Sequence, residues 1–479
     1  CAGILTPKEM LEGFSNKGMI TVALLFLVSE GIRQSGTLGQ VIKKLLPQGK
    51  TTVFKAQLRI LPSVAFISAF LNNTPVVVIF APIIKHWAKS VNLPATKFLI
   101  PLSYVTILGG ICTLIGTSTN LVVHGMILEA GFEGFSMFEL GKVGIFIAIA
   151  GIIYIFLFSK RLLPDARPDT AVPDEEVEEG EKLHRVEAVL GARFPGINKK
   201  LKDFNFQRHY GAEVKEIKTR NGQRFVSNLE EVVLHEGDTL VVMADDTFIP
   251  TWGESSVFVL LTNGNEPDTT GKKKRWFALL LLVLMIVGAT VGELPVTKEM
   301  FPDIKLDMFF FVSITTIIMA WTNLFPARKY TKYISWDILI TIACAFAISK
   351  AMVNSGVADS VAKFIIGLSD DYGPHVLLAM VFIITNLFTE LITNNAAAAL
   401  AFPLALSISA QLGVSPTPFF VVICMAASAS FSTPIGYQTN LIVQGIGNYK
   451  FTDFVRIGLP LNIITFLISI ILIPLIWNF

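Results

Sequence analysis

Two short runs of amide and hydroxyl side chains lie inside apolar sequence, and their chemistry suits a hard cation and an anion together. Sodium prefers oxygen ligands, which hydroxyls, side-chain amides and unpaired backbone carbonyls provide. Where a helix is interrupted, free carbonyls face cations, and the N–H groups of the next helix face anions. We name these runs tip 1 (Asn72-Asn73-Thr74) and tip 2 (Thr393-Asn394-Asn395).

Further polar residues accompany each tip. Ser68 lies four residues before Asn72 and Thr389 lies four before Thr393, so each pair is expected to stack on one helix face. Two Gly-containing segments are the partners of the tips, and we name them loop 1 (Gly116-Thr117-Ser118-Thr119-Asn120) and loop 2 (Gly436-Tyr437-Gln438-Thr439-Asn440).

The tips and loops are parts of an internal repeat with an offset of 320–321 residues. TLIGTSTNLVVHG (Thr113–Gly125) reappears as TPIGYQTNLIVQG (Thr433–Gly445), with eight of thirteen positions identical, and Ser29–Gly36 matches Ser349–Gly356. Helix-interrupting polar segments in matching places of two halves indicate the binding site of a secondary transporter. The alternative, that these small polar residues only permit close helix packing, leaves three matches in one order unexplained.

The composition is that of a membrane protein. Mean hydropathy is +0.60 and only 16% of residues are charged, against about 25% in soluble proteins. Several segments approach the roughly 20 apolar residues that cross a bilayer. The clearest expected spans are Val143–Phe158, Phe277–Val291, Leu306–Leu324, Ile334–Ser349 and Phe454–Trp477. The four cysteines have no metal-ligand spacing.

The second copy of the repeat has two apolar segments, 277–291 and 306–324, before the part that matches the first copy. The first copy has none, and the chain starts at Cys1. We therefore expect about two N-terminal spans to be missing from this chain.

Lysine and arginine mark cytoplasmic loops, and their distribution orients the two tips oppositely. Lys50 and Lys55 precede tip 1, and Lys85 and Lys89 follow it, so both ends of that segment are expected inside, as in a re-entrant hairpin. Five expected spans separate the two hairpins: Phe98–Met126, which loop 1 breaks, and then the segments 143–158, 277–291, 306–324 and 334–352. Because five is odd, tip 2 opens from the outside and the repeats are inverted.

The sequence thus predicts an all-α polytopic membrane protein with inverted repeats, two re-entrant helical hairpins, two broken helices and a small α+β insert. The expected divisions are 1–164 for membrane repeat 1, 165–271 for the insert and 272–479 for membrane repeat 2. Basic residues on both sides of the insert place it in the cytoplasm. We expect the protein in the inner or plasma membrane of a cell.

The insert combines an acidic linker with strand-like runs. Asp174–Glu181 is the linker, and Asn221–Gly222 is a hairpin turn signal. The expected strands are Arg185–Leu190, Glu213–Thr219, Arg224–Ser227, Thr239–Met243 and Val257–Leu261. The segment FPGINKKLKDFNFQRHYGAEVKEIKTRNGQ, followed by LHEGDTLVVMADD, resembles the TrkA-C (RCK C-terminal) module. That resemblance implies a small regulatory ligand or an assembly role; a structural cap is the alternative.

With its twin tips and loops, the membrane part resembles the divalent-anion:sodium symporter family. The resemblance implies about two sodium sites, no organic cofactor, a small anionic substrate, an elevator-type mechanism, a homodimer in membrane lipid, and no nucleic-acid partner. By position, one sodium site would comprise Ser68, Asn72, Asn73 and Gly116, and the other Thr389, Thr393, Asn394 and Gly436. The substrate would be bound by Asn73, Thr74, Thr117, Asn394, Asn395 and Tyr437.

The chain departs from the family pattern at several positions. Tyr437 is bulkier than the expected threonine, which favours a small oxyanion over a dicarboxylate, and the combination with a TrkA-C-like module resembles the branch associated with sulfate. Asn72 and Thr393 replace serines, and Asn395 replaces a threonine. The function predicted is therefore sodium-coupled symport of sulfate, with dicarboxylate symport as the alternative.

Glu390 adjoins Thr389 and has no acidic counterpart in the first copy. An ionisable residue at membrane depth is a functional candidate. This one either carries a coupling proton or sets the local charge, or else it pairs with a polar neighbour or reaches the interface. A less favoured reading of the whole chain, an RCK-regulated ion channel, predicts a filter such as TVGYG, which the sequence lacks. It also lacks a Walker motif and a nucleophile elbow, so we expect no enzyme.

Overall fold

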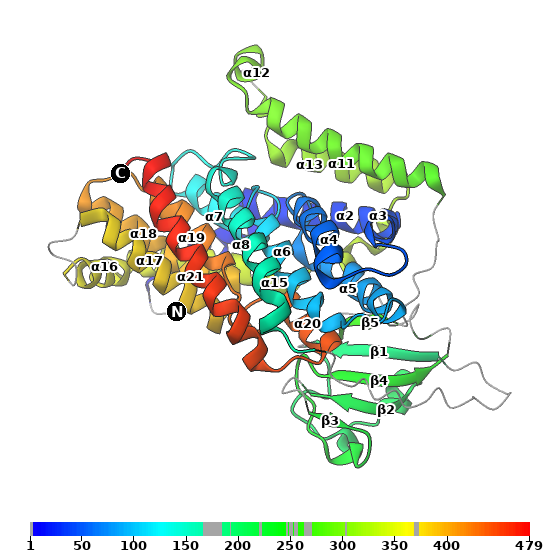
Figure 1. The fold of residues 1–479 in the computed structure, drawn as a ribbon. Helices are drawn as coiled ribbons and strands as arrows, with labels where there is room; N and C mark the ends of the chain where they lie inside the picture. Colours follow the sequence, from blue (N-terminus) through cyan, green and yellow to red (C-terminus); the bar gives the residue numbers. More distant parts are fainter. Residues whose placement is uncertain are drawn as a thin grey trace.

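A body of packed helices forms the larger part of the molecule, and a small sheet lies against one end of it, next to α20 (Gln438–Gly447) (Figure 1). The computed structural model describes residues 3–165, 184–191, 193–219, 223–245, 248, 252, 257–262, 271–301, 304–367 and 373–479.

The helices of the two repeats correspond one to one, in the same order. The first repeat comprises α2 (Lys17–Gln34), α3 (Thr37–Leu45), α4 (Val53–Ser68), α5 (Asn73–Ser90), α6 (Leu99–Gly110), α7 (Ser118–Glu129) and α8 (Gly141–Leu162). The second comprises α15 (Trp336–Asn354), α16 (Val357–Gly367), α17 (Gly373–Leu391), α18 (Asn394–Leu412), α19 (Thr417–Ser428), α20 and α21 (Phe451–Ile476). Both helical hairpins (α4–α5 and α17–α18) and both broken helices (α6–α7 and α19–α20) are as predicted.

The described residues form further helices and 3-10 turns, both in the membrane part and in the insert. The remaining helices are α1 (Pro7–Glu12), α9 (Phe206–Tyr210), α11 (Lys272–Gly292), α12 (Pro295–Met300), α13 (Met308–Trp321) and α14 (Tyr330–Tyr333). The 3-10 turns are η1 (Gly13–Ser15), η2 (Ala95–Lys97), η3 (Leu201–Asp203), η4 (Leu229–Glu231) and η5 (Ala327–Lys329). Helices α11 and α13 pack on each other, and α12 protrudes beyond them (Figure 1).

Seven helical segments of the described chain are long and apolar enough to cross a membrane, so this is a multi-pass membrane protein. Four of the five expected spans lie in such segments, in α8, α11, α15 and α21. The fifth expectation was too long: Leu306–Leu324 forms α13, whose 14 residues fall short of the roughly 20 needed. Helices α17 and α18 also satisfy the length requirement, so the re-entry of their hairpin stays a prediction.

Helices α6 and α19 lie at the centre of the helical body. Every residue of α6 is buried, and so is every residue of α19 after Thr417. A helix that is apolar on all sides must be surrounded by protein or lipid. Because each of these two helices leads directly into a break, both breaks lie deep inside the molecule.

The insert forms a five-stranded antiparallel sheet of order β3-β2-β4-β1-β5. The strands are β1 (His184–Leu190), β2 (Glu213–Lys218), β3 (Arg224–Phe225), β4 (Thr239–Ala244) and β5 (Phe258–Thr262), so all five predicted strands are confirmed. Buried aromatic residues, including Phe194, Phe206 and Tyr210, form a core separate from that of the helices. The predicted linker Asp174–Glu181 and turn Asn221–Gly222 lie outside the described residues, and the predicted division of the chain at 165 and 271 stays a prediction.

Close packing of α21 on the segment after α19 generates a stability prediction. A Cβ atom at Gly458 would overlap with the backbone carbonyl of Phe431, whereas one at Gly367 would meet nothing within 4 Å. Gly458→Ala should therefore destabilise the protein by about 1–3 kcal/mol, seen as a lower melting temperature in detergent. Gly367→Ala is the matched control and should not lower it. Equal melting temperatures for both variants would contradict the packing described.

Candidate functional site

Tip 1 is organised by one asparagine. Helix α4 ends at Ser68, whose hydroxyl donates a 2.8 Å hydrogen bond to Asn73 Oδ1, at the start of α5. The amide Nδ2 of Asn73 donates a 2.6 Å bond to the Tyr437 hydroxyl. Ser68 and Asn73 are fully buried. The spacing had paired Ser68 with Asn72, but the hydroxyl contacts the central asparagine of the tip instead. The reason is that the helix ends at Ser68, so i,i+4 geometry no longer applies.

Tip 2 repeats this arrangement. The Thr389 hydroxyl lies 2.9 Å from Asn394 Oδ1 and 2.6 Å from the carbonyl of Ala427. It, too, contacts the residue five positions ahead and not Thr393. In both repeats, therefore, a buried hydroxyl, an asparagine oxygen and nearby backbone carbonyls lie close together.

Each tip contacts the loop of the other repeat. The Tyr437 hydroxyl, which accepts from Asn73, lies 3.1 Å from Thr117 Oγ1 and also interacts with the side chain of Asn394. Thr74 Oγ1 donates to Gln438 Oε1 over 3.2 Å. The sequence-predicted residues of the two repeats are therefore brought together at one place.

The reciprocal contact is made by tip 2. Asn395 Oδ1 accepts hydrogen bonds from Ser118 Oγ at 3.3 Å and Thr119 Oγ1 at 3.1 Å, both in loop 1. Two sets of contacts, tip 1 with loop 2 and tip 2 with loop 1, thus join the repeats.

Sequence reasoning missed two threonines that brace the loops. Thr113 Oγ1 donates to the carbonyl of Ala69 and accepts from Gly116 N at 3.1 Å. Its counterpart Thr433 donates to the carbonyl of Glu390 and accepts from Gly436 N, both at 3.2 Å. Each threonine so ties a loop to the end of the hairpin helix before the tip. Both stand in the repeated string, which is the signal that could have identified them.

Glycine is required where the loops approach the tips. A Cβ at Gly116 would overlap with the backbone of Gly110, and one at Gly110 would lie 2.6 Å from Asn73 Oδ1. A Cβ at Gly436 would overlap with Ser430 and lie 2.7 Å from the carbonyl of Thr389. Backbone and amide oxygens are thereby crowded around both tips, as the ligation of a small hard cation requires.

Four helices begin at this place: α5, α7, α18 and α20. Their N-cap residues are Asn72, Thr117, Thr393 and Tyr437, and none of these side chains accepts a hydrogen bond from its own helix. The first N–H groups of a helix carry partial positive charge and bind anions when no side chain caps them. The geometry can therefore hold an anion between the tips and cations behind them.

Glu390 is half-buried and held by neutral groups. It accepts from the backbone N–H of Ser432 at 2.9 Å, from Asn462 Nδ2 at 2.8 Å and from Ser430 Oγ at 3.4 Å. The predicted pairing of Glu390 with polar neighbours is therefore present. Asn462, on α21, is a further residue that sequence reasoning missed, and nothing in its surroundings of apolar residues indicated the contact.

The fold and this site define a multi-pass membrane transporter. The citrate transporter family matches residues 1–413 and 304–478, and this chain belongs to that family. An uncharacterized transporter of Synechocystis, sll0640, is 30% identical over 99% of this chain and 91% of its own length. Sodium/sulfate cotransporter 2 of Chlamydomonas reinhardtii is 31% identical over 58% of this chain and 31% of its length. Human solute carrier family 13 member 4 is 25% identical over 33% of this chain and 24% of its own length.

The Tyr437 hydroxyl joins the repeats and should therefore contribute to stability. Tyr437→Phe removes the acceptor of the buried Asn73 amide, at a cost of about 1–3 kcal/mol, and should lower the melting temperature in detergent. Tyr330→Phe, at an exposed tyrosine, is the control and should leave it unchanged. An unaltered melting temperature for Tyr437→Phe would contradict the bridging role of this hydroxyl.

Proposed function

We propose that this protein is a sodium-coupled symporter of a small divalent oxyanion, sulfate first, working by an elevator-type mechanism. The observation that carries the proposal is the meeting of four uncapped helix N-termini between two buried pairs of hydroxyl and asparagine. A helix N-terminus favours an anion, whereas the oxygens of each pair favour a cation. The relatives include proteins named sodium/sulfate cotransporters.

The two sodium sites lie behind the tips and are built from corresponding residues of the two repeats. Neutral oxygens dominate both, as suits a monovalent ion that must be released again on the other side. The first site is formed by Ser68, Asn72, Asn73 and Gly116, and the second by Thr389, Thr393, Asn394 and Gly436.

The anion binds between the tips, against Thr74, Asn395, Thr117 and Tyr437. Tyr437 occupies this space from loop 2 and is 8% exposed, whereas repeat 1 carries Thr117 at the same place. A tetrahedral oxyanion fits beside a phenol ring better than a four-carbon dicarboxylate does. Organic di- or tricarboxylate transport is the second candidate, because the matching family is described by citrate transport.

Glu390 sets the local charge of the second sodium site. Its backbone carbonyl is bound by Thr433, which also braces Gly436, and its carboxylate is fixed by Asn462. A negative group at this depth favours a cation nearby, so repeat 2 should bind its sodium more tightly than repeat 1.

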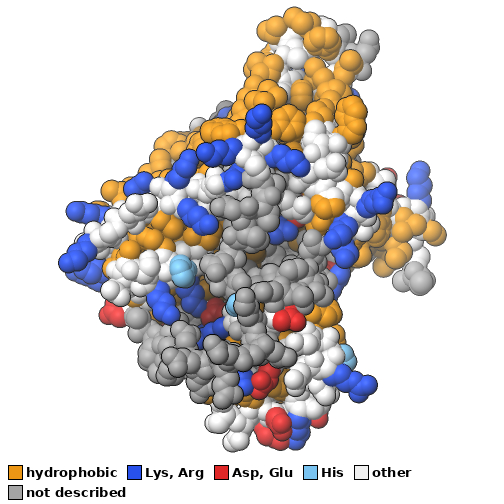
Figure 2. Space-filling model, turned by 90° about the vertical axis from the view of Figure 1, so that its right-hand side faces the viewer, with side chains coloured by type: hydrophobic (Ala, Val, Ile, Leu, Met, Phe, Trp, Pro, Cys, Tyr) orange, Lys and Arg blue, Asp and Glu red, His pale blue; other side chains and the backbone are white. Residues whose placement is uncertain are grey.

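The orientation in the membrane follows from charge. Figure 2 shows lysine and arginine side chains in a band across the helical body beside the insert. This band supports a cytoplasmic insert, by the positive-inside rule. A homodimer, and a small ligand of a TrkA-C-like insert, complete the proposal.

The first test is uptake of labelled sulfate into proteoliposomes under an imposed sodium gradient. The gradient should accelerate uptake, and Asn73→Ala and Asn394→Ala should each reduce it at least about tenfold, the loss typical of a disturbed ion site. Ser63→Ala is the control, because this α4 hydroxyl lies outside the tips and donates to the carbonyl of Arg59 on its own helix. A sulfate uptake rate that does not change with the sodium gradient, or full uptake activity of both asparagine variants, would refute the proposal.

The second test concerns the choice of anion. Tyr437→Thr makes loop 2 like loop 1 and opens space, so the ratio of succinate to sulfate uptake should rise roughly tenfold or more. Tyr437→Phe keeps the ring and should preserve the wild-type ratio even if its rate falls. A ratio that stays constant in Tyr437→Thr would show that this side chain does not select the substrate.

A further inference from the structure

The sheet insert lies directly on α20, the helix that begins at loop 2. A Cβ atom at Gly445 would lie 2.6 Å from Thr239 Oγ1 of β4, and one at Gly237, before β4, would lie 2.6 Å from the Leu441 side chain. Strand β1 packs on the same helix. Because a glycine is needed both on α20 and in the insert, the two surfaces are closely packed.

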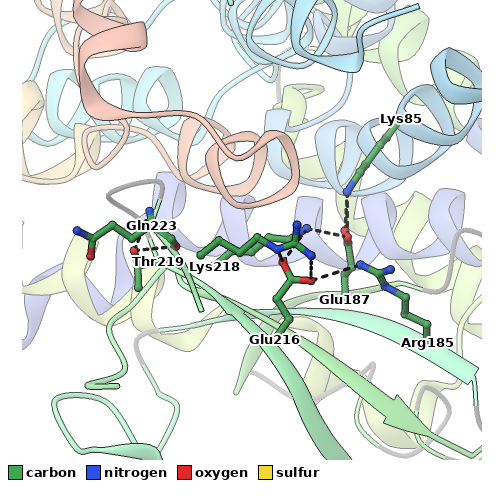
Figure 3. A network of polar contacts seen from close by, with 8 residues as sticks. Lys85, Arg185, Glu187, Glu216, Lys218, Thr219 and Gln223 are labelled. Atoms are coloured by element: carbon green, nitrogen blue, oxygen red, sulfur yellow. Dashed lines mark hydrogen bonds and ion pairs between the residues drawn. The ribbon is translucent and has the colours of Figure 1, made fainter. Parts of the chain in front are cut away.

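The insert also holds α5, the helix that begins at tip 1. Lys85 Nζ lies 2.9 Å from both carboxylate oxygens of Glu187 on β1, and Lys218 Nζ lies 3.4 Å from one of them (Figure 3). Lys85 is twelve residues beyond Asn73, about three helical turns along α5. The lysine and glutamate side chains are 20% and 15% exposed, so water screens this ion pair only weakly.

The charge on Glu187 is permanent near neutral pH. Burial by itself raises the pKa of this carboxyl group, but Lys85 and Lys218 overcome that effect and hold the pKa at about 2. Removal of one partner from a buried ion pair leaves an uncompensated charge and is strongly destabilising for the contact. Glu216 beside it is held in turn by Arg224 and Arg185.

The corresponding helices of the two repeats, α7 and α20, have different packing partners. Gly445 corresponds to Gly125 on α7, where a Cβ would lie 2.6 Å from Asn16 Oδ1, at the start of α2. At this repeated position α7 therefore packs on a helix of the membrane part, whereas α20 packs on the insert. The insert is thus a packing partner of the second repeat.

We propose that the face formed by β1 and the turn before β4 is a docking surface for α5 and α20, and that it holds tip 1 closed against loop 2. The two helices begin at Asn73 and Gln438, and their first residues make the contacts Asn73–Tyr437 and Thr74–Gln438. A ligand or partner that shifts the sheet would thereby alter the opening of tip 1. This inference goes beyond the proposed function, since it requires only that tip 1 opens and closes, whatever the ion or anion.

The test measures the opening of tip 1 directly. In protein whose four native cysteines are replaced by alanine, Thr74→Cys is labelled with a maleimide in detergent or liposomes. Lys85→Glu and Glu187→Lys should each raise the labelling rate at least about fivefold, the lower range of typical coupling between sites. The double exchange Lys85→Glu with Glu187→Lys should bring the labelling rate back below that of either single variant, with Lys218 beside position 187 keeping the restoration incomplete.

Lys89→Glu is the matched control, because Lys89 is exposed on α5 one turn beyond Lys85; its labelling rate should equal that of the parent. Labelling needs no substrate, so its outcome is separate from that of the uptake experiments. Unchanged rates in both single variants, or no restoration in the exchange, would overturn the proposal. If a reversal unfolds the insert, Lys85→Ala removes one partner of the ion pair without reversing a charge, and a parental labelling rate there would equally overturn the proposal.

Discussion

The need to satisfy backbone and side-chain polar groups inside an apolar helical body governs this structure. Two broken helices and two hairpin tips lie in its interior, and each of these four interruptions frees N–H and C=O groups that lipid cannot satisfy. The structure satisfies part of this need by bringing the interruptions together, so that tip 1 meets loop 2 and tip 2 meets loop 1. The proposed binding site and the contact between the repeats are consequently the same place. A change in one is expected to alter the other.

Much of this was predictable from sequence because the causes are local. Clusters of asparagine, glycine and hydroxyl residues within apolar sequence favour an interruption of the helix, and short runs bounded by turn residues mark the strands of the insert. The partners of these residues depend on the tertiary fold. The spacing paired Ser68 with Asn72, whereas the helix ends and the hydroxyl contacts Asn73. Asn462 contacts Glu390 from a helix 72 residues away in sequence, and no periodicity encodes that contact.

The two halves share a backbone plan and differ where charge and volume decide chemistry. Thr117 faces Tyr437 across the site, and Ala69 stands where the second repeat has Glu390. An anion site built from two equal halves would be symmetric and roomy. A phenol on one side makes it smaller, and a carboxylate behind one tip favours a cation there. The function proposed depends on these departures more than on the repeat itself.

The contact between the insert and the membrane part also depends on pairing polar groups that are shielded from water. Lys85 and Glu187 are each half-buried, and each would be costly to bury alone, so the ion pair stabilises the contact only while both surfaces stay together. The close approach at Gly445 makes the two surfaces complementary in shape as well as in charge. Such a contact is specific but sensitive to small displacements. The attraction between the two charges weakens with distance, whereas the cost of removing them from water stays until the surfaces separate. An interface of this kind, placed on the two helices that begin at tip 1 and loop 2, is suited to transmit a movement of the sheet to the site.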